Sequence, residues 1–173
     1  MTIVRRLQAD DAPAYRALML DAYARHPDAF TSSAAERSAL PLSWWQARLD
    51  TDPLTKEAVF GAFTDEGVLS GAVGLSYETR EKARHKAQLF GMVVLAQQRS
   101  QGFGAALVQA VLAEARSRAW IRLVQLTVTE GNESARRLYE RHGFVPFGVE
   151  PLAVAVGERY VAKVHMWCDL HAP

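Results

Sequence analysis

Residues 97–119 read QQRSQGFGAALVQAVLAEARSRA and combine a glycine-containing loop with the pattern of a helix. Apolar side chains recur at the three- and four-residue spacing of an amphipathic helix, at Leu107, Val108, Val111, Leu112 and Ala115. Gly102 and Gly104 stand at the entrance of this helix, although glycine is a poor helix former. We therefore expect another chemical group to approach the bare backbone at this point.

Strands flank the glycine loop and its helix. An apolar run over residues 85–95 leads into the loop, and a β-rich run over residues 121–129 follows the helix. A second helix, residues 132–143, begins at an Asn cap and ends at Gly143. The other predicted elements are a strand over 2–7, a helix over 10–26, a loop or broken helix over 26–41, a short helix over 42–50, a hairpin of 57–64 and 68–80, and two last strands over 144–157 and 158–170.

This order of elements predicts a single α/β (α+β) domain over residues 1–173. Most strands are adjacent in the sequence and helices separate only some of them, which indicates a mixed sheet rather than a wholly parallel one. The chain is long enough for one full hydrophobic core, and it contains no internal repeat or low-complexity stretch.

Composition argues against several classes of partner. A formal net charge of +1 gives no support for binding to nucleic acid or to a membrane surface. The single cysteine, Cys168, leaves no internal disulfide, and the five histidines form no HxxxH or HExxH pair, so we predict no metal site. The first residues lack the apolar core of a signal peptide, and no apolar run is long enough to span a membrane. We expect a cytoplasmic protein.

The sequence RSQGFG at residues 99–104 has three possible interpretations as a phosphate-binding site. A P-loop requires a lysine after its second glycine, and no lysine follows Gly102 or Gly104. A dinucleotide fingerprint requires a third glycine where Leu107 stands, and the strand over 121–129 ends in threonines instead of an acidic residue. The remaining pattern, RxxGxG between a strand and a helix, aims free backbone N–H groups and the positive end of the helix dipole at an anion, with Arg99 adjacent. This arrangement suits a pyrophosphate.

The sequence resembles the GNAT superfamily of acyl-CoA-dependent N-acetyltransferases. Its pyrophosphate motif, [RQ]xxGx[GA], corresponds to RSQGFG at residues 99–104. Residues 128–144, VTEGNESARRLYERHGF, are similar to the second cofactor segment of the family, an Asn-initiated helix that contains Tyr and ends in Gly-Phe. The resemblance implies a mostly antiparallel sheet of six to seven strands with a splayed central strand pair and about four flanking helices. It also implies acetyl-CoA as cosubstrate.

The resemblance further implies roles for individual residues. Tyr139 would protonate the departing thiolate, and Asn132 would lie along the pantetheine arm; with Ala135 they are spaced to share one helix face. The plainer interpretation is that Tyr139 packs in the core and Asn132 only caps the helix. The strand before the loop would pair with pantetheine, with Gly91 available for a bend. The implied cofactor-binding set is Met92, Val93, Val94, Arg99, Ser100, Gln101, Gly102, Phe103, Gly104, Ala105, Asn132, Ala135 and Tyr139.

Position alone suggests residues on the acceptor side. We expect the irregular stretch over residues 26–50 to form much of that wall, and we select four candidates from the whole chain: Glu36, Trp45, Glu78 and His85. Each has a plainer interpretation as a surface charge, a core ring or a solvated strand end. The acceptor would be a primary amine of a small molecule or a peptide, and a homodimer is left open. The alternative function is a non-catalytic acyl-CoA-binding module or sensor.

Overall fold

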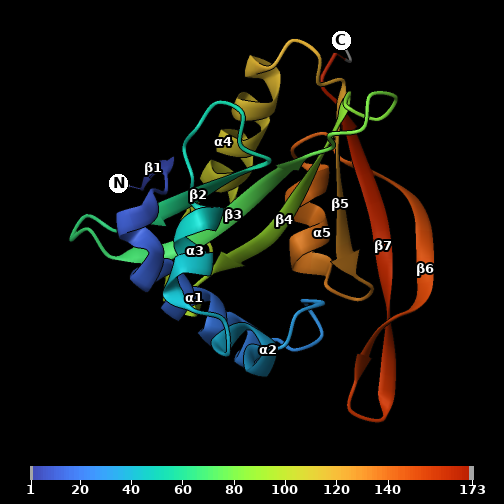
Figure 1. Cartoon of the computed structure of the whole chain (residues 1–173). Coiled ribbons are helices and arrows are strands. Elements are labelled where there is room, and N and C mark those ends of the chain that lie inside the picture. The colour runs from blue at the N-terminus through green and yellow to red at the C-terminus, as the bar shows by residue number, and fades with distance from the viewer. Residues whose placement is uncertain (1, 172–173) are drawn as a thin grey trace.

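A computed structural model describes residues 2–171, which form one seven-stranded sheet and five α-helices (Figure 1). The strand order is β1-β2-β3-β4-β5-β7-β6, and all neighbours except β4 and β5 are antiparallel. The strands are β1 Ile3–Arg6, β2 Glu57–Phe63, β3 Leu69–Tyr77, β4 Lys86–Val94, β5 Leu123–Thr129, β6 Val145–Val156 and β7 Arg159–Asp169. The helices are α1 Ala12–Arg25, α2 Ala34–Ser38, α3 Leu42–Arg48, α4 Phe103–Ser117 and α5 Glu133–Glu140.

The predicted mixed, mostly antiparallel sheet is confirmed, with one more helix than expected. The extra helix, α2, lies in the stretch expected to be a loop or broken helix. A capping box forms it: the Ser33 hydroxyl accepts from the Glu36 amide, and the Glu36 carboxylate accepts from the Ser33 amide. Across residues 2–171, no helix is both long and apolar enough to cross a bilayer.

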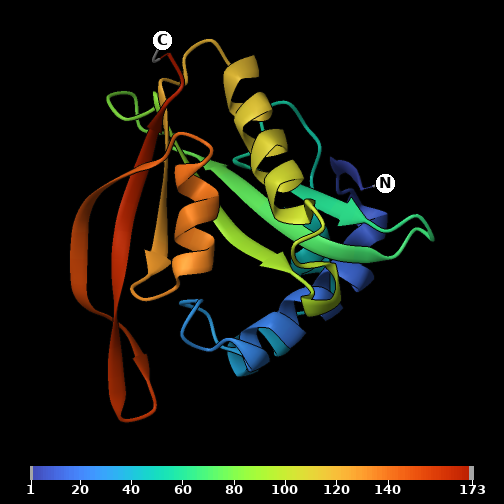
Figure 2. The same cartoon turned by 180° about the vertical axis from the view of Figure 1, so that it is seen from behind.

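Helices cover both faces of the sheet. Helices α1 and α3 pack on one face, where their core includes Tyr15, Met19 and Trp45 (Figure 1). Helices α4 and α5 pack on the opposite face (Figure 2), where Leu107, Val111 and other apolar positions of α4 are buried as their spacing predicted.

Strands β4 and β5 diverge in the centre of the sheet. Their parallel pairing covers only three residue pairs, from Lys86–Leu123 to Gln88–Gln125. On its other edge β4 carries a bulge, since the pairing with β3 jumps from Gly74–Phe90 to Ala72–Val93. Gly91 lies in this bulge with a φ of 62°, a left-handed conformation that favours glycine. The expected splayed pair and the bend at Gly91 are therefore both present, and Figure 2 shows α5 beside the gap.

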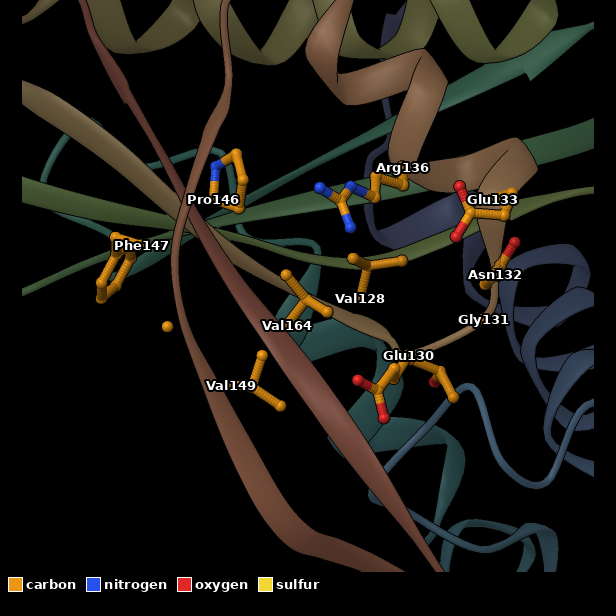
Figure 3. Close-up of a pocket in the computed structure, with 12 residues that line it drawn as sticks. Val128, Glu130, Gly131, Asn132, Glu133, Arg136, Pro146, Phe147, Val149 and Val164 are labelled. Carbon is orange, nitrogen blue, oxygen red and sulfur yellow. The ribbon is translucent and has the colours of Figure 1, made fainter.

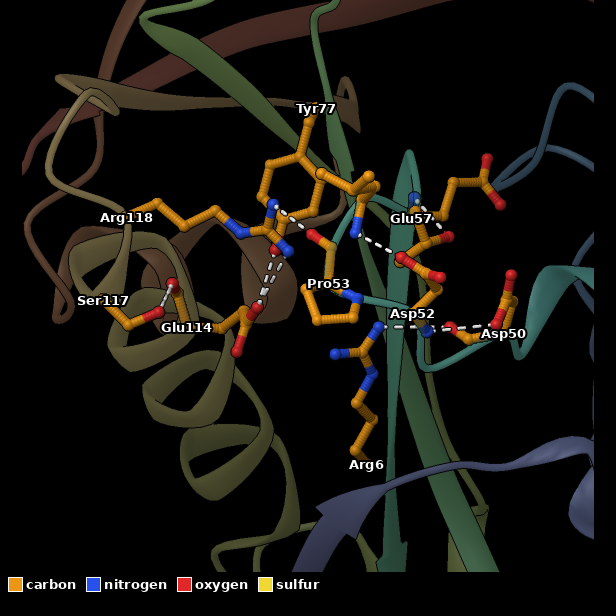
Figure 4. A network of polar contacts seen from close by, with 11 residues as sticks. Arg6, Asp50, Asp52, Pro53, Glu57, Tyr77, Glu114, Ser117 and Arg118 are labelled. Carbon is orange, nitrogen blue, oxygen red and sulfur yellow. Dashed lines mark hydrogen bonds and ion pairs between the residues drawn. The ribbon is translucent and has the colours of Figure 1, made fainter.

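A polar network holds the last turns of α4 against the end of the sheet where β4 and β5 are still paired (Figure 4). The Tyr77 hydroxyl donates to the Glu114 carboxylate at 2.8 Å, and the Arg118 guanidinium lies 3.8 Å from the centre of the Tyr77 ring. Arg118 also forms an ion pair with Glu114 at 3.5 Å and donates to the Pro53 carbonyl. Burial of the side chain raises the pKa of Tyr77 most, and the hydrogen bond to the Glu114 carboxylate raises it further. The hydroxyl therefore remains protonated and a donor at neutral pH.

Tyr77→Phe tests the energetic role of this network. The substitution keeps the ring and removes one hydrogen bond to a charged acceptor, so we expect a loss of about 1.5–3 kcal/mol in the free energy of unfolding. Urea unfolding measures the loss. Tyr160→Phe is the matched control, because Tyr160 is largely exposed. Equal stability of Tyr77→Phe and the wild type would show that the hydrogen bond from Tyr77 to Glu114 contributes nothing.

Candidate active site

The divergence of β4 and β5 opens a cleft of about 790 Å³. Four segments line it: the end of β4, the start of α4 with its preceding loop, the turn from β5 into α5 with that helix as far as Arg141, and the connection between α1 and α2. The cleft is thus built where one sheet splits.

The glycine loop presents unpaired backbone amides to this cleft. The first hydrogen bond of α4 joins the Ala106 amide to the Gly102 carbonyl at 3.0 Å, so the amides of Phe103, Gly104 and Ala105 have no partner within the helix. Ser100 and Gly102 have φ values of 63° and 84°. A Cβ atom added at Gly102 would meet nothing within 4 Å, which leaves this backbone open to a ligand.

Gly104 has a second reason to be glycine. A Cβ atom built at this position would lie 3.0 Å from Cδ2 of Leu138 on α5. Gly104 therefore allows α4 and α5 to approach closely, in addition to exposing backbone at the cleft.

Arg99 adds positive charge beside the free amides. Its Nη2 atom lies 3.2 Å from Nε2 of His26, and its Nε donates to the Val94 carbonyl at 3.4 Å. Arg141, at the end of α5, also lines the cleft. Backbone amides, a helix N-terminus and arginine together form a binding site for an anion such as a pyrophosphate.

Helix α5 forms a wall of the cleft beside the glycine loop, where Leu138 approaches Gly104. The Asn132 side-chain oxygen accepts from the Ala135 amide at 3.2 Å, so Asn132 caps the helix as its sequence position predicted. Asn132, Ala135 and Leu138 all line the cleft. Asn132 is therefore both a cap and a lining residue.

Tyr139 turns into the core beside the cleft. Its side chain is only 4% exposed, and its ring packs edge-on against Phe144 with 5.8 Å between centroids. The hydroxyl forms no hydrogen bond with any of residues 2–171. Burial raises the pKa of Tyr139, so the hydroxyl keeps its proton at neutral pH. Tyr139 is absent from the cleft lining, whereas the neighbouring Leu138 belongs to it.

The structure brings most of the expected cofactor residues together. Three of them do not line the cleft: Gln101, Phe103 and Tyr139. The Phe103 and Tyr139 side chains are buried in the core, and the side-chain amide of Gln101 donates to the Gln97 carbonyl at 2.6 Å. The residues that do are Met92, Val93, Val94, Arg99, Ser100, Gly102, Gly104, Ala105, Asn132 and Ala135.

The four expected acceptor residues lie elsewhere. Trp45 is 0% exposed and packs against the rings of Tyr15 and Trp44, so its side chain is part of the core. Glu36 caps α2, and its hydrogen bonds to the Ser33 amide and hydroxyl lower its pKa. Neither residue lines the cleft, and each has a local role in the fold, as a buried ring or as a helix cap.

Glu78 and His85 lie at the opposite end of β3 and β4 from the cleft. The Glu78 carboxylate is 2.7 Å from Nη2 of Arg80, whose hydrogen bonds lower the pKa of Glu78 to about 2. His85 is exposed in the turn before β4, where its carbonyl accepts from the Arg122 amide. The cleft takes its β4 residues from the other end of the strand, at Met92–Val94.

Residues that sequence reasoning missed complete the cleft. One group comes from the connection between α1 and α2: His26, Asp28, Ala29 and Phe30. Only this first part of the stretch over 26–50 lines the cleft. The other group surrounds the recognised second segment: Thr129, Glu130, Gly131, Ser134, Leu138 and Arg141. The second group could have been predicted from the sequence, because its residues belong to the recognised cofactor segment over 128–144.

A second cavity of about 580 Å³ shares the turn between β5 and α5 with the cleft. Figure 3 shows Val128, Val149 and Val164 gathered beside Arg136 of α5 in this cavity. It contains neither the glycine loop nor β4, so it offers no comparable set of free amides. Within residues 2–171, no group of three or more His, Cys, Asp or Glu side chains is arranged to hold a metal ion.

The fold is shared with known acetyltransferases. The chain is similar to a GNAT-family acetyltransferase from Streptococcus pneumoniae, with a TM-score of 0.85, 23% identity, and coverage of 96% of this chain and 98% of the other. It is also similar to yncA from Salmonella typhimurium, solved with its cofactor acetyl-CoA, with a TM-score of 0.80, 18% identity, and coverage of 100% and 96%. For a ribosomal-protein-alanine N-acetyltransferase from Brucella melitensis the TM-score is 0.78, the identity 20%, and the coverage 96% and 99%.

Sequence similarity gives the family directly. A model of the acetyltransferase (GNAT) family matches residues 15–144, which include the glycine loop, the splayed strands and α5. Acetyl-CoA is the cosubstrate of this family, and the anion site of the cleft fits its pyrophosphate. This protein is therefore an acyltransferase that belongs to the acetyltransferase (GNAT) family.

Proposed function

We propose that the chain transfers the acetyl group of acetyl-CoA directly to a primary amine of a small molecule or a peptide. The main support is that the free amides of the glycine loop, Arg99 and the end of β4 line one cleft. The reaction would take place in the cytoplasm.

Separate parts of the cleft suit separate parts of the cosubstrate. The free amides of Gly104 and Ala105, with Arg99, would hold the pyrophosphate. Beyond Gln88, β4 has no strand pairing with β5 among the described residues, so its backbone at Met92–Val94 can pair with the amides of the pantetheine arm. Acetyl-CoA supplies the activated thioester carbonyl.

The remaining cleft residues suit an amine. A primary amine is mostly an ammonium ion at neutral pH, and Asp28 and Glu130 are lining residues of the cleft whose negative charge would attract it. After losing a proton, the nitrogen attacks the thioester carbonyl, whose oxygen a backbone amide of β4 would polarise. The proposal includes both peptides and small molecules as acceptors. The structurally similar protein from Brucella melitensis is named as a ribosomal-protein-alanine N-acetyltransferase.

A panel of amines tests this function. The purified chain is incubated with acetyl-CoA and single amines, including amino acids, polyamines and peptides, and free CoA is measured with a thiol reagent. Cys168 is buried and adds little background. We expect at least one amine to raise CoA release well above the amine-free rate. Tight acetyl-CoA binding without any amine-dependent release would favour the non-catalytic module.

Tyr139 is the proposed proton donor for the departing thiolate. It lies on α5 directly after Leu138, a cleft residue, and its protonated hydroxyl has no partner among the described residues. Because the side chain lies behind the cleft lining, this role requires the hydroxyl to reach the cleft when acetyl-CoA is bound.

Tyr139→Phe should lower kcat by about 100-fold if proton transfer limits the rate, while acetyl-CoA affinity and Tm change little. Tyr15→Phe is the matched control: Tyr15 is equally buried, burial also raises its pKa, and it lies in the other core cluster. Full kcat in Tyr139→Phe, with chemistry shown to be rate-limiting, would assign Tyr139 to packing alone.

We also propose that the chain forms a homodimer through β6. Val145, Phe147 and Val149 are each more than half exposed on this edge strand, and Phe147 and Val149 border the second cavity. Exposed apolar side chains grouped in this way are typical of a protein interface. A two-fold dimer would cover the same patch on both copies.

Sedimentation tests the dimer. We expect the wild type to sediment at twice the 19.2 kDa chain mass at micromolar concentration and Phe147→Asp to sediment as a monomer. Leu54→Asp is the control, since Leu54 is highly exposed but lies in the loop before β2. A monomeric wild type would refute the dimer.

A further inference from the structure

The connection between α1 and α2 forms one wall of the cleft without belonging to the sheet. Residues 26 and 28–30 line the cleft from this segment. Within the segment, the Ala29 amide donates to the His26 carbonyl at 3.0 Å, and the Phe30 ring packs edge-on against Tyr23 of α1. These contacts fix the turn to its own helix, but they do not fix its distance from β5 across the cleft.

Lys163 on β7 supplies that second attachment. Its Nζ atom donates to the Ala29 carbonyl at 3.1 Å, to the Asp28 carbonyl at 3.4 Å and to the Thr129 hydroxyl at 2.9 Å. The Thr129 hydroxyl in turn donates to the Asp28 carbonyl at 2.7 Å. Thr129 pairs with Lys163 in the register of β5 and β7, so both side chains lie on one face of the sheet. The ammonium group thus joins the turn to the end of β5.

The burial of Lys163 is unusual in this protein. With 6% exposure it is the one charged side chain that is buried among residues 2–171. Burial lowers the pKa of Lys163, although Asp28 and Glu150 act in the opposite direction. A buried ammonium is unfavourable unless its donors are used, and here each has an oxygen acceptor. Packing alone would favour an apolar residue at this position, so the lysine requires another explanation.

We propose that Lys163 is a positioning residue that fixes the wall formed by residues 28–30 and so sets the width of the cleft on its acceptor side. The assignment of that side rests on the proposed function. Arg159 adds a weaker contact, with 3.9 Å between its guanidinium and the Asp28 carboxylate at the surface. Glycine-loop residues make no contact with Lys163, so acetyl-CoA binding should depend on it much less than acceptor binding.

Lys163→Met tests the attachment, because it keeps an unbranched chain of similar length and removes the donors. Hydrogen exchange measured by mass spectrometry should show at least tenfold faster exchange over residues 26–33, with α4 unchanged. Lys82→Met, at an exposed position in the turn before β4, is the matched control and should leave exchange over 26–33 unaltered. Unchanged exchange in a folded Lys163→Met protein would overturn the proposal, whether or not the chain acetylates amines.

Kinetics with an active amine form the second arm. We expect KM for the acceptor to rise at least fivefold in Lys163→Met while KM for acetyl-CoA changes less than twofold. An equal rise in both constants would indicate general loosening and would contradict a specific role at the acceptor wall. If Lys163→Met does not fold, Lys163→Gln removes the charge and shortens the side chain, so its amide reaches fewer of the three acceptors. It should show faster exchange over 26–33 than the wild type, and wild-type exchange in a folded Lys163→Gln protein would overturn the proposal.

Discussion

The short pairing between β4 and β5 is the constraint on which the site depends. Three residue pairs join the strands at one end, and beyond Gln88 the strands separate. The bulge at Gly91 bends β4 away, so Met92–Val94 reach the cleft with one edge free of strand pairing to β5. Helix α4 follows β4 after a short loop, and α5 follows β5, so both helix N-termini lie beside the gap. A fully paired sheet would close the cleft and leave the glycine loop without a ligand path.

Local chemistry made the cofactor side predictable. Two glycines, an adjacent arginine and a helical pattern indicated an anion site at residues 99–104, and an Asn cap indicated the start of α5. Each of these signals depends on neighbours a few residues apart, which a sequence shows directly. The bend at Gly91 was expected only from the family resemblance, and its φ of 62° now gives the physical reason for glycine there.

The acceptor side was not predictable in the same way. Trp45, Glu36, Glu78 and His85 were selected from residue type and position along the chain, and they lie in the core, at a helix cap, in an arginine pair and in a turn. The role of Lys163 could not be predicted from the sequence. Two of its acceptors, the carbonyls of Asp28 and Ala29, are more than a hundred residues upstream, and the third, the Thr129 hydroxyl, lies on the paired strand. Its partners are backbone carbonyls, which carry no residue signature. Long-range contacts of this kind require the three-dimensional structure.

An NMR titration of the labelled chain with acetyl-CoA tests the central claim most directly, because it reports on each backbone amide separately. The account predicts that the largest shifts occur at two separate segments, Gly102–Ala105 and Met92–Val94, which the sheet divergence brings to one cleft. Amides of Phe147 and Val149 at the second cavity should shift little. Dominant shifts at the second cavity, with the glycine loop and β4 unchanged, would contradict the account.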